Sequence, residues 1–162
     1  GITALMYAAQ QGHGDAVSAL LAAGAFVLPS TNGDGRQALH FAVEQPLLVE
    51  DRTVAVVRSL LQRLSNAEKR AVLAAQTTDR AKEKPLHIAA RGGLLRVVEL
   101  LVQSEGGTGA PAEEVLEVAN GASRTPLLEA AAARHFPVVR FLLQSGANRE
   151  AVGEGGRTVL HL

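Results

Sequence analysis

The chain has 162 residues, of which 47% are hydrophobic and 20% charged, and 16 basic side chains balance 16 acidic ones. That apolar share is too high for a disordered chain, and zero net charge argues against a general binder of nucleic acid. The absence of cysteine excludes a disulfide scaffold, a thiolate metal site and a thiol nucleophile, and it fits an intracellular, cytoplasmic location. Aromatic residues make up only 3%, so a core must be built from alanine, leucine and valine, which favours closely packed helices.

The uncharged segment 16–32 could be mistaken for a membrane span. Its apolar part, Ala16–Leu28, has 13 residues, whereas a helix needs about 20 to cross a bilayer, and Gly24 interrupts it. No basic region precedes it, so it also fits a secretory signal poorly. We therefore expect no membrane insertion.

Internal repeats determine the expected fold. Four segments align with one another, and each is followed by a second pattern of Val and Leu at positions 0, +3 and +4. The marker leucines of these segments and of a fifth, truncated one are 34, 47, 41 and 33 residues apart, which indicates a repeat array with insertions. The segments are TALMYAA (3–9), QALHFAV (37–43), KPLHIAA (84–90), TPLLEAA (125–131) and TVLHL (158–162), with marker leucines Leu5, Leu39, Leu86, Leu127 and Leu160.

Each repeat is expected to form a helix, a turn and a second helix. Small residues three and four positions after the marker leucine lie on one helical face, so a neighbouring helix can approach closely. Threonines can cap these helices, prolines fit their first turn, and glycines permit the reversal and the stop. These residues are Thr3, Thr125 and Thr158; Pro85 and Pro126; Gly12 and Gly93; and Gly24 and Gly146. One helix pair cannot bury its apolar face, whereas a stack of pairs can.

These residues resemble the ankyrin-repeat family. The family has a T-P-L-H-x-A-A start, a G-H turn, a V-V-x-x-L-L second helix and a G-A-D/N hairpin. This chain carries them as TALMYAA, GHGDAV and LLAAGA, as KPLHIAA and VVELL, and as TPLLEAA and VVRFLLQSGAN. The resemblance implies an all-α solenoid of stacked helix–turn–helix units across residues 1–162, with partner proteins bound on a concave face of hairpin tips and first helices. The expected repeats are 1–34, 35–81, 82–122 and 123–155, with a partial one at 156–162.

Two of the units carry extra residues. The second repeat has an insertion within EQPLLVEDRT (44–53), and the second and third repeats each carry eight extra residues after their second helix. Both lack the glycine that stops this helix elsewhere, with Leu64 and Glu105 in its place. We expect a short helix to replace the hairpin in each. These helices are NAEKRAVLAAQ (66–76), capped by Ser65 or Asn66, and APAEEVLEVAN (110–120), with Pro111, Glu113 and Glu114 in its first turn.

We predict no catalytic, cofactor or metal site. The histidines fall at two repeat positions: His40, His87 and His161 at one, His13 and His135 at the other. The resemblance implies that the first position is structural, with a hydrogen bond to neighbouring backbone. Layers about 8–10 Å apart cannot bring one column onto a zinc ion, whose ligand atoms lie at about 2 Å. Nucleophile motifs are absent, and the glycine-rich stretches 106–109 and 153–156 lack the lysine of a phosphate-binding loop.

One column of the array is the main candidate for partner binding. At the hairpin end, three residues before each marker leucine, it holds Ile2, Arg36, Glu83, Arg124 and Arg157. The resemblance implies that this end faces a partner. Arg36, Arg124 and Arg157 could form a stripe that binds acidic side chains. The alternative is that arginine is simply ordinary at an exposed position.

Further candidates follow the first helices. The polar residues after the small-residue stripe are Gln10, Gln11, Glu44, Gln45 and Arg91. Tyr7 and Phe41, in a column with Glu129, are either aromatic anchors for a partner or part of the core. Leu47 and Leu48, in an unusually apolar loop, either pack back onto the array or form a docking patch.

We expect the chain to be a non-catalytic scaffold for protein–protein interaction. It starts without Met at a first helix and ends within a fifth, where apolar stacking faces would be exposed. This predicts an excerpt of a longer protein, flanked by further repeats. The alternative is the targeting or regulatory arm of a larger enzyme or channel whose working domain lies outside this segment.

Overall fold

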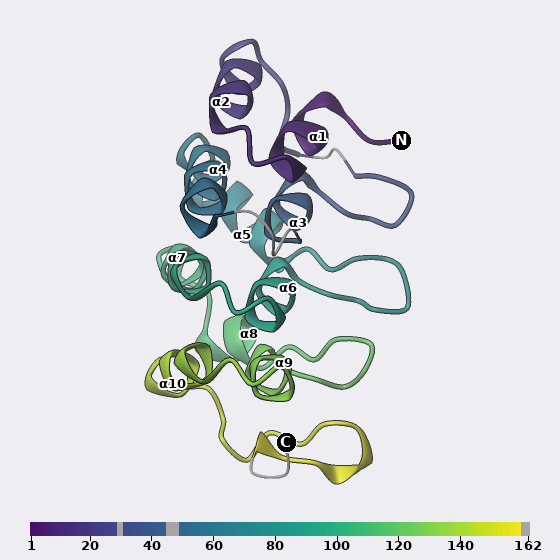
Figure 1. Cartoon of the computed structure of the whole chain (residues 1–162), viewed down its shortest axis with the longest axis vertical. Helices are drawn as coiled ribbons and strands as arrows, with labels where there is room; N and C mark the ends of the chain where they lie inside the picture. Colours follow the sequence, from purple (N-terminus) through teal and green to yellow (C-terminus); the bar gives the residue numbers. More distant parts are fainter. Residues whose placement is uncertain (29–30, 45–48, 160–162) are drawn as a thin grey trace.

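The computed structural model describes residues 1–28, 31–44 and 49–159, and within them the chain is helical, with no β-strand. The helices come in pairs, which confirms the predicted all-α stack of helix–turn–helix units (Figure 1). The pairs are α1 (Ala4–Gln10) with α2 (Gly14–Ala22), α3 (Ala38–Val43) with α4 (Glu50–Gln62), α6 (Pro85–Arg91) with α7 (Leu95–Gly106), and α9 (Pro126–Ala132) with α10 (Phe136–Gln144). The remaining elements are α5 (Asn66–Ala74), α8 (Ala112–Leu116) and the 3-10 turn η1 (Glu154–Gly156).

Local sequence accounts for where these helices start and end. The hydroxyl of Thr3 accepts a hydrogen bond from the Met6 backbone N–H at 3.2 Å, and Thr125 caps α9 in the same way. Such caps satisfy backbone donors that have no partner inside the helix. Between paired helices, Gly93 has φ +71°, a left-handed conformation that favours glycine. The side chain of His135 lies against it, in the space a Cβ would need.

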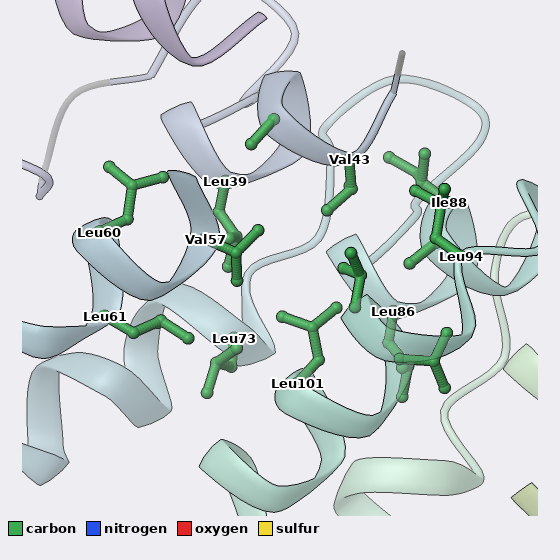
Figure 2. Packing of buried hydrophobic residues seen from close by; sticks show 14 of the residues in the cluster. Leu39, Val43, Val57, Leu60, Leu61, Leu73, Leu86, Ile88, Leu94 and Leu101 are labelled. Carbon is green, nitrogen blue, oxygen red and sulfur yellow. The ribbon is translucent and has the colours of Figure 1, made fainter. Parts of the chain in front are cut away.

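The paired helices form two columns, and consecutive units contact each other in both (Figure 1). The first helices, α1, α3, α6 and α9, make one column, and α2, α4, α7 and α10 make the other. Leu39, Leu86 and Leu101 fill the space between them and are almost completely buried (Figure 2). Burying one leucine contributes about 1.5–3 kcal/mol, so the repeated leucines supply much of the stability of the stack.

In the described part of the chain, four hairpins lie along one edge of the stack, on the side of the first column (Figure 1). Each is closed by a backbone hydrogen bond of 2.8–3.0 Å across its base. The first hairpin (31–36) is closed by Asn32 and Arg36, the second (77–83) by Thr77 and Glu83, the third (120–124) by Asn120 and Arg124, and the fourth (153–157) by Gly153 and Arg157. The expectation that a short helix replaces the second and third hairpins is therefore wrong, because α5 and α8 are added before these hairpins.

The hairpins are retained because they hydrogen-bond to one another. The Thr78 N–H donates to the Asp34 carbonyl, and the Gly121 N–H donates to the Ala81 carbonyl, both at 2.7 Å. A lost hairpin would leave its neighbour's backbone groups without these partners. Gly121 is required at its position, because an added Cβ would overlap the carbonyl oxygen of Arg80.

The two added helices are present where the sequence predicts them, although α8 is shorter. Ser65 caps α5 and exchanges hydrogen bonds with Glu68, whose pKa is lowered by the Ser65 hydroxyl. Both helices pack against α7. Arg70 of α5 and Glu114 of α8 form an ion pair at 2.6 Å, so the two insertions also contact each other.

A buried ion pair fixes α8 to the array. Lys84, directly before α6, and Glu105, near the end of α7, are 3% and 2% exposed, and their Nζ and Oε1 atoms are 3.4 Å apart. The Lys84 ammonium also donates to the Glu114 carbonyl of α8 at 2.5 Å. Burial raises the pKa of Glu105, and the nearby Lys84 charge opposes this rise. Each charge therefore depends on the other.

Removing Lys84 alone should be much worse than removing the pair. We expect Lys84→Met to lower the free energy of unfolding by roughly 3–5 kcal/mol, because Glu105 would remain buried without its counter-charge. The double variant Lys84→Met/Glu105→Leu should recover most of that loss. Urea unfolding of both single variants and the double variant measures the coupling. Additive losses would contradict the pairing.

Gly121→Ala should destabilise the hairpin stack by about 1–3 kcal/mol, because the new methyl group overlaps the Arg80 carbonyl. Gly106→Ala, at the end of α7, is the matched control, since its Cβ would meet nothing within 4 Å. Thermal unfolding followed by circular dichroism measures both changes. Equal effects of the two substitutions would show that the second and third hairpins are not in close contact.

Candidate functional site

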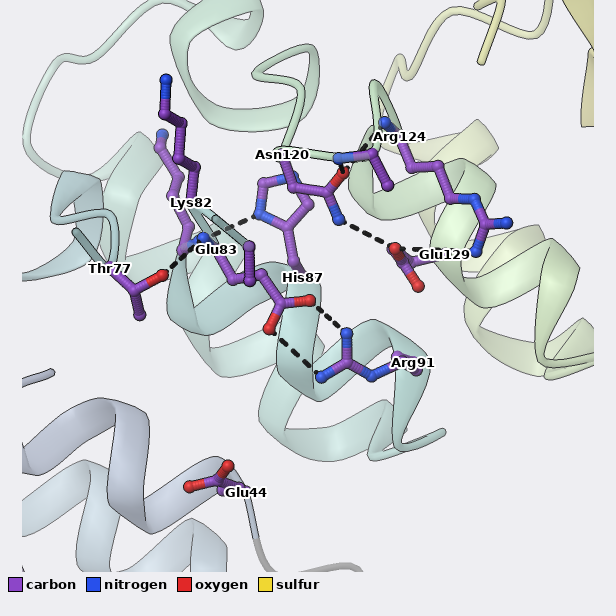
Figure 3. Close-up of polar contacts among 12 residues, drawn as sticks. Glu44, Thr77, Lys82, Glu83, His87, Arg91, Asn120, Arg124 and Glu129 are labelled. Carbon is purple, nitrogen blue, oxygen red and sulfur yellow. Dashed lines mark hydrogen bonds and ion pairs between the residues drawn. The ribbon is translucent and has the colours of Figure 1, made fainter. Parts of the chain in front are cut away.

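The candidate site is the hairpin face, which we define as the surface formed by the four hairpins and the exposed sides of α1, α3, α6 and α9. The arginine column predicted from the sequence lies here, but it is not a continuous basic stripe. Arg36 forms an ion pair with Glu44 at 2.5 Å between Nη1 and Oε1. The next column member, Glu83, is buried, and its carboxylate is bound by both terminal nitrogens of Arg91 (Figure 3).

These two ion pairs have the same spacing in sequence, but the order of the acidic and the basic residue is reversed. In each, a residue at the hairpin end binds the residue eight positions later, near the end of the first helix. The second repeat uses Arg36 with Glu44, and the third uses Glu83 with Arg91. The alternation favours attraction between layers, since the charges of Glu44 and Glu129 both raise the pKa of Arg91.

The fourth repeat breaks this pattern. The residue eight positions after Arg124 is Ala132, which carries no charge. Arg124 instead lies 3.9 Å from Oε1 of Glu129, beyond hydrogen-bonding distance, and its side chain is 39% exposed. That same carboxylate oxygen already accepts a hydrogen bond from Asn120 Nδ2 at 2.8 Å (Figure 3). The Arg124 guanidinium is therefore left with unused donors.

Two adjacent grooves meet at Arg124. The first, of about 400 Å³, lies between the second and third hairpins and is lined by Arg80, Glu83, Arg91, Arg124 and Glu129 together with small residues of both hairpins. The second, of about 310 Å³, lies between the third and fourth hairpins and is lined by Arg124, Leu128, Gly153, Glu154, Gly155 and Arg157. Together they form a track along the hairpin face.

His40 and His87 join each unit to the next and do not face these grooves. Nδ1 of His87 accepts a hydrogen bond from the Lys84 backbone N–H at 3.1 Å, so Nε2 carries the proton and donates to the Val118 carbonyl at 2.9 Å. His40 bonds Gln37 and Glu83 in the same way. Desolvation lowers the pKa of His40, and it lowers that of His87 to about 4. Both rings are structural, as the family resemblance implies, and His161 lies outside the described residues.

Comparison with known families agrees with this architecture. The family model described as ankyrin repeats (3 copies) matches residues 1–72 and 86–162. The chain belongs to the ankyrin-repeat family. No curated protein sequence matches it. Among the residues that the structure describes, no helix has the length and apolarity required to cross a membrane, and no three His, Asp or Glu side chains gather as a metal site would require.

The other candidates of the ankyrin array are scattered. Tyr7 is 61% exposed on α1, whereas Phe41 is 4% exposed and belongs to the core, the second of the two interpretations left open for it. Gln10 is half-buried, and Gln11 and Arg157 are exposed. Gln45, Leu47 and Leu48 lie outside the described residues, so the roles considered for them stay predictions.

Sequence reasoning missed two groove residues of the ankyrin array. Arg80 lies within the second hairpin, which the sequence expectation had replaced by a helix. Glu129 is buried and hydrogen-bonded to Asn120, a contact that was not predicted from the sequence. A signal for the second case existed, since Asn120 stands where Asn32 closes the first hairpin, and both Oδ1 atoms accept bonds from hairpin N–H groups.

The low pKa of His87 predicts a loss of stability in mild acid. Because its folded pKa of about 4 lies below the unfolded value of about 6.5, the unfolded chain binds more protons as the pH falls. We expect His87 alone to lower the free energy of unfolding by about 2 kcal/mol between pH 7 and pH 5. Urea unfolding at both pH values measures this, with His87→Gln as the control.

His87→Gln keeps a donor for the Val118 carbonyl but loses both the bond to Lys84 and the titrating group. It should be less stable than the wild type at pH 7 and should lose less stability on going to pH 5. If His87→Gln loses as much free energy of unfolding between pH 7 and pH 5 as the wild type does, His87 does not titrate as its burial requires.

Proposed function

We propose that this chain is a non-catalytic protein–protein interaction scaffold whose partners dock on the hairpin face. Ankyrin repeats are generally protein-interaction modules, and the family is typically non-enzymatic. The observation that carries the proposal is the track of two grooves along the hairpins, whose exposed members include arginines. A rigid stack loses little conformational entropy when a partner binds.

The arrangement of ionisable groups supports a non-catalytic role. The two histidines with lowered pKa are bonded to backbone on both ring nitrogens, so neither is free to transfer a proton to a ligand. The buried carboxylates Glu83 and Glu129 are bound by Arg91 and Asn120. Through these contacts, the histidines and the buried carboxylates hold the hairpins in place. The absence of cysteine fits a cytoplasmic setting for the scaffold.

A second candidate is the targeting or regulatory arm of a larger enzyme or channel, in which the same face would bind a partner or another domain. Exposed apolar residues favour contact with further chain: Phe136 and Leu143 on α10 remain exposed at the end of the second column. We propose that a further repeat packs there.

Affinity capture with matched surface variants tests the scaffold proposal. We expect the hairpin-face variant Tyr7→Ala/Gln11→Ala/Arg124→Ala to lose most of the proteins that the wild-type chain captures from a lysate of the cells that express it. The control variant Phe26→Ala/Gln62→Ala/Arg52→Ala changes the same kinds of exposed side chain outside the four hairpins and the first helices, and it should retain them. Circular dichroism and the melting temperature verify that both variants fold.

Two outcomes would contradict the proposal. Equal capture by the two variants would show that partners dock elsewhere on the molecule. Capture of nothing beyond the background of an unrelated protein would show that the chain is no interaction module by itself.

A further inference from the structure

Three arginines line the track, one at each end and one at its centre. They differ from the other arginines of the hairpin face in their ion pairs. Arg80 lies on the second hairpin, Arg124 at the end of the third and Arg157 at the end of the fourth. We call them the arginine track. Within the described residues, Arg80 and Arg157 have no ion pair, whereas Arg36 and Arg91 are each bound to a carboxylate. Arg124 has only a long ion pair of 3.9 Å with Glu129, so Arg80 and Arg157 are the members of the track whose charge no described carboxylate pairs.

We propose that the arginine track binds an extended segment of a partner protein that carries spaced carboxylates. This inference rests on the proposed function and names the chemistry of the partner. Arg124 is the centre of the site because it lines both grooves. A carboxylate of the partner takes the place relative to Arg124 that Glu44 has relative to Arg36, a place left empty of charge by Ala132.

The surroundings favour separate carboxylates over a continuous polyanion such as nucleic acid. Glu83, Glu129 and Glu154 also line the two grooves and would repel a chain of closely spaced phosphates. None of the groove residues is aromatic, so bases would find no side chain to stack on. The net charge of the whole chain is zero, which gives no long-range attraction for nucleic acid.

The repeat spacing predicts the spacing of the acidic residues. Neighbouring layers of packed helices lie roughly 8–10 Å apart, and an extended peptide advances about 3.3 Å per residue. Carboxylates three residues apart therefore match arginines on neighbouring hairpins. Arg124 and Arg157 hold the same position at the ends of consecutive hairpins, so acidic residues at positions i and i+3 match them, and a third acidic residue three positions away lies on the side of Arg80.

Fluorescence anisotropy with synthetic peptides tests the proposal on the full 162-residue chain. The probe is a fluorescein-labelled, acetylated Gly/Ser nonapeptide with glutamate at three positions spaced by three, and its control has glutamine at the same positions. We expect the glutamate peptide to bind at least tenfold more tightly at low ionic strength, and added salt should weaken it. Equal affinity for the two peptides would overturn the inference.

Two pairs of variants locate the site. Arg124→Gln should weaken binding of the glutamate peptide about tenfold, because charged hydrogen bonds are lost. Arg149→Gln removes one exposed arginine outside both grooves and should change affinity less than twofold. Ala132→Glu should weaken binding about as much as Arg124→Gln, since it gives Arg124 an internal partner, whereas Ala132→Gln should have little effect. Equal effects within either pair would overturn the assignment of Arg124.

A 12-nucleotide single-stranded DNA serves as the competing ligand. If it binds as tightly as the glutamate peptide and depends on Arg124, the track is a polyanion site and the inference is wrong. If the peptide fails while the hairpin-face variant Tyr7→Ala/Gln11→Ala/Arg124→Ala still loses its captured partners, the scaffold proposal stands and only the acidic partner is excluded.

Discussion

The array depends on hydrogen bonds that cross from one repeat to the next. Apolar contacts between leucine-rich helices are strong but non-directional, so they do not by themselves set how far one unit is displaced along its neighbour. The rings of His40 and His87 remove that freedom, because each binds the start of its own helix through Nδ1 and, through Nε2, the segment that leads to the first helix of the next unit. The backbone bonds between successive hairpins, such as Gly121 to Ala81, complete the register.

Most of the fold could be predicted because it is encoded locally. The marker leucines, the capping threonines and the turn glycines each act within a few residues, and the structure has the helices where these residues place them. The hairpins of the second and third units could not be predicted in this way. An insertion of given length is compatible either with a helix added before the hairpin or with a helix that replaces it. Contact with another hairpin, 40 or more residues away in sequence, decides between the two.

The candidate site could be predicted from the sequence only in part, for a related reason. The sequence places Arg36, Arg124 and Arg157 in one column, but it does not show which guanidinium is already bound to a carboxylate. That depends on the residue eight positions later, whose relation to the column appears only when the helix and the hairpin are folded against each other. Phe41 shows the same limit, since its burial depends on neighbouring units and not on its own helix.

Some repeats carry charged residues that the other repeats lack, and these residues differ in how closely they are paired with an opposite charge. Lys84 and Glu105 occur together in the interior, where an unpaired charge would cost several kcal/mol, so neither charge is stable without the other. Ala132 leaves Arg124 with only a long ion pair to Glu129 at the surface, where water solvates the guanidinium and the cost is small. This array therefore has an incompletely paired charge on its exposed face and a closely paired one in its interior. The exposed face is also where such a charge remains free to bind a ligand.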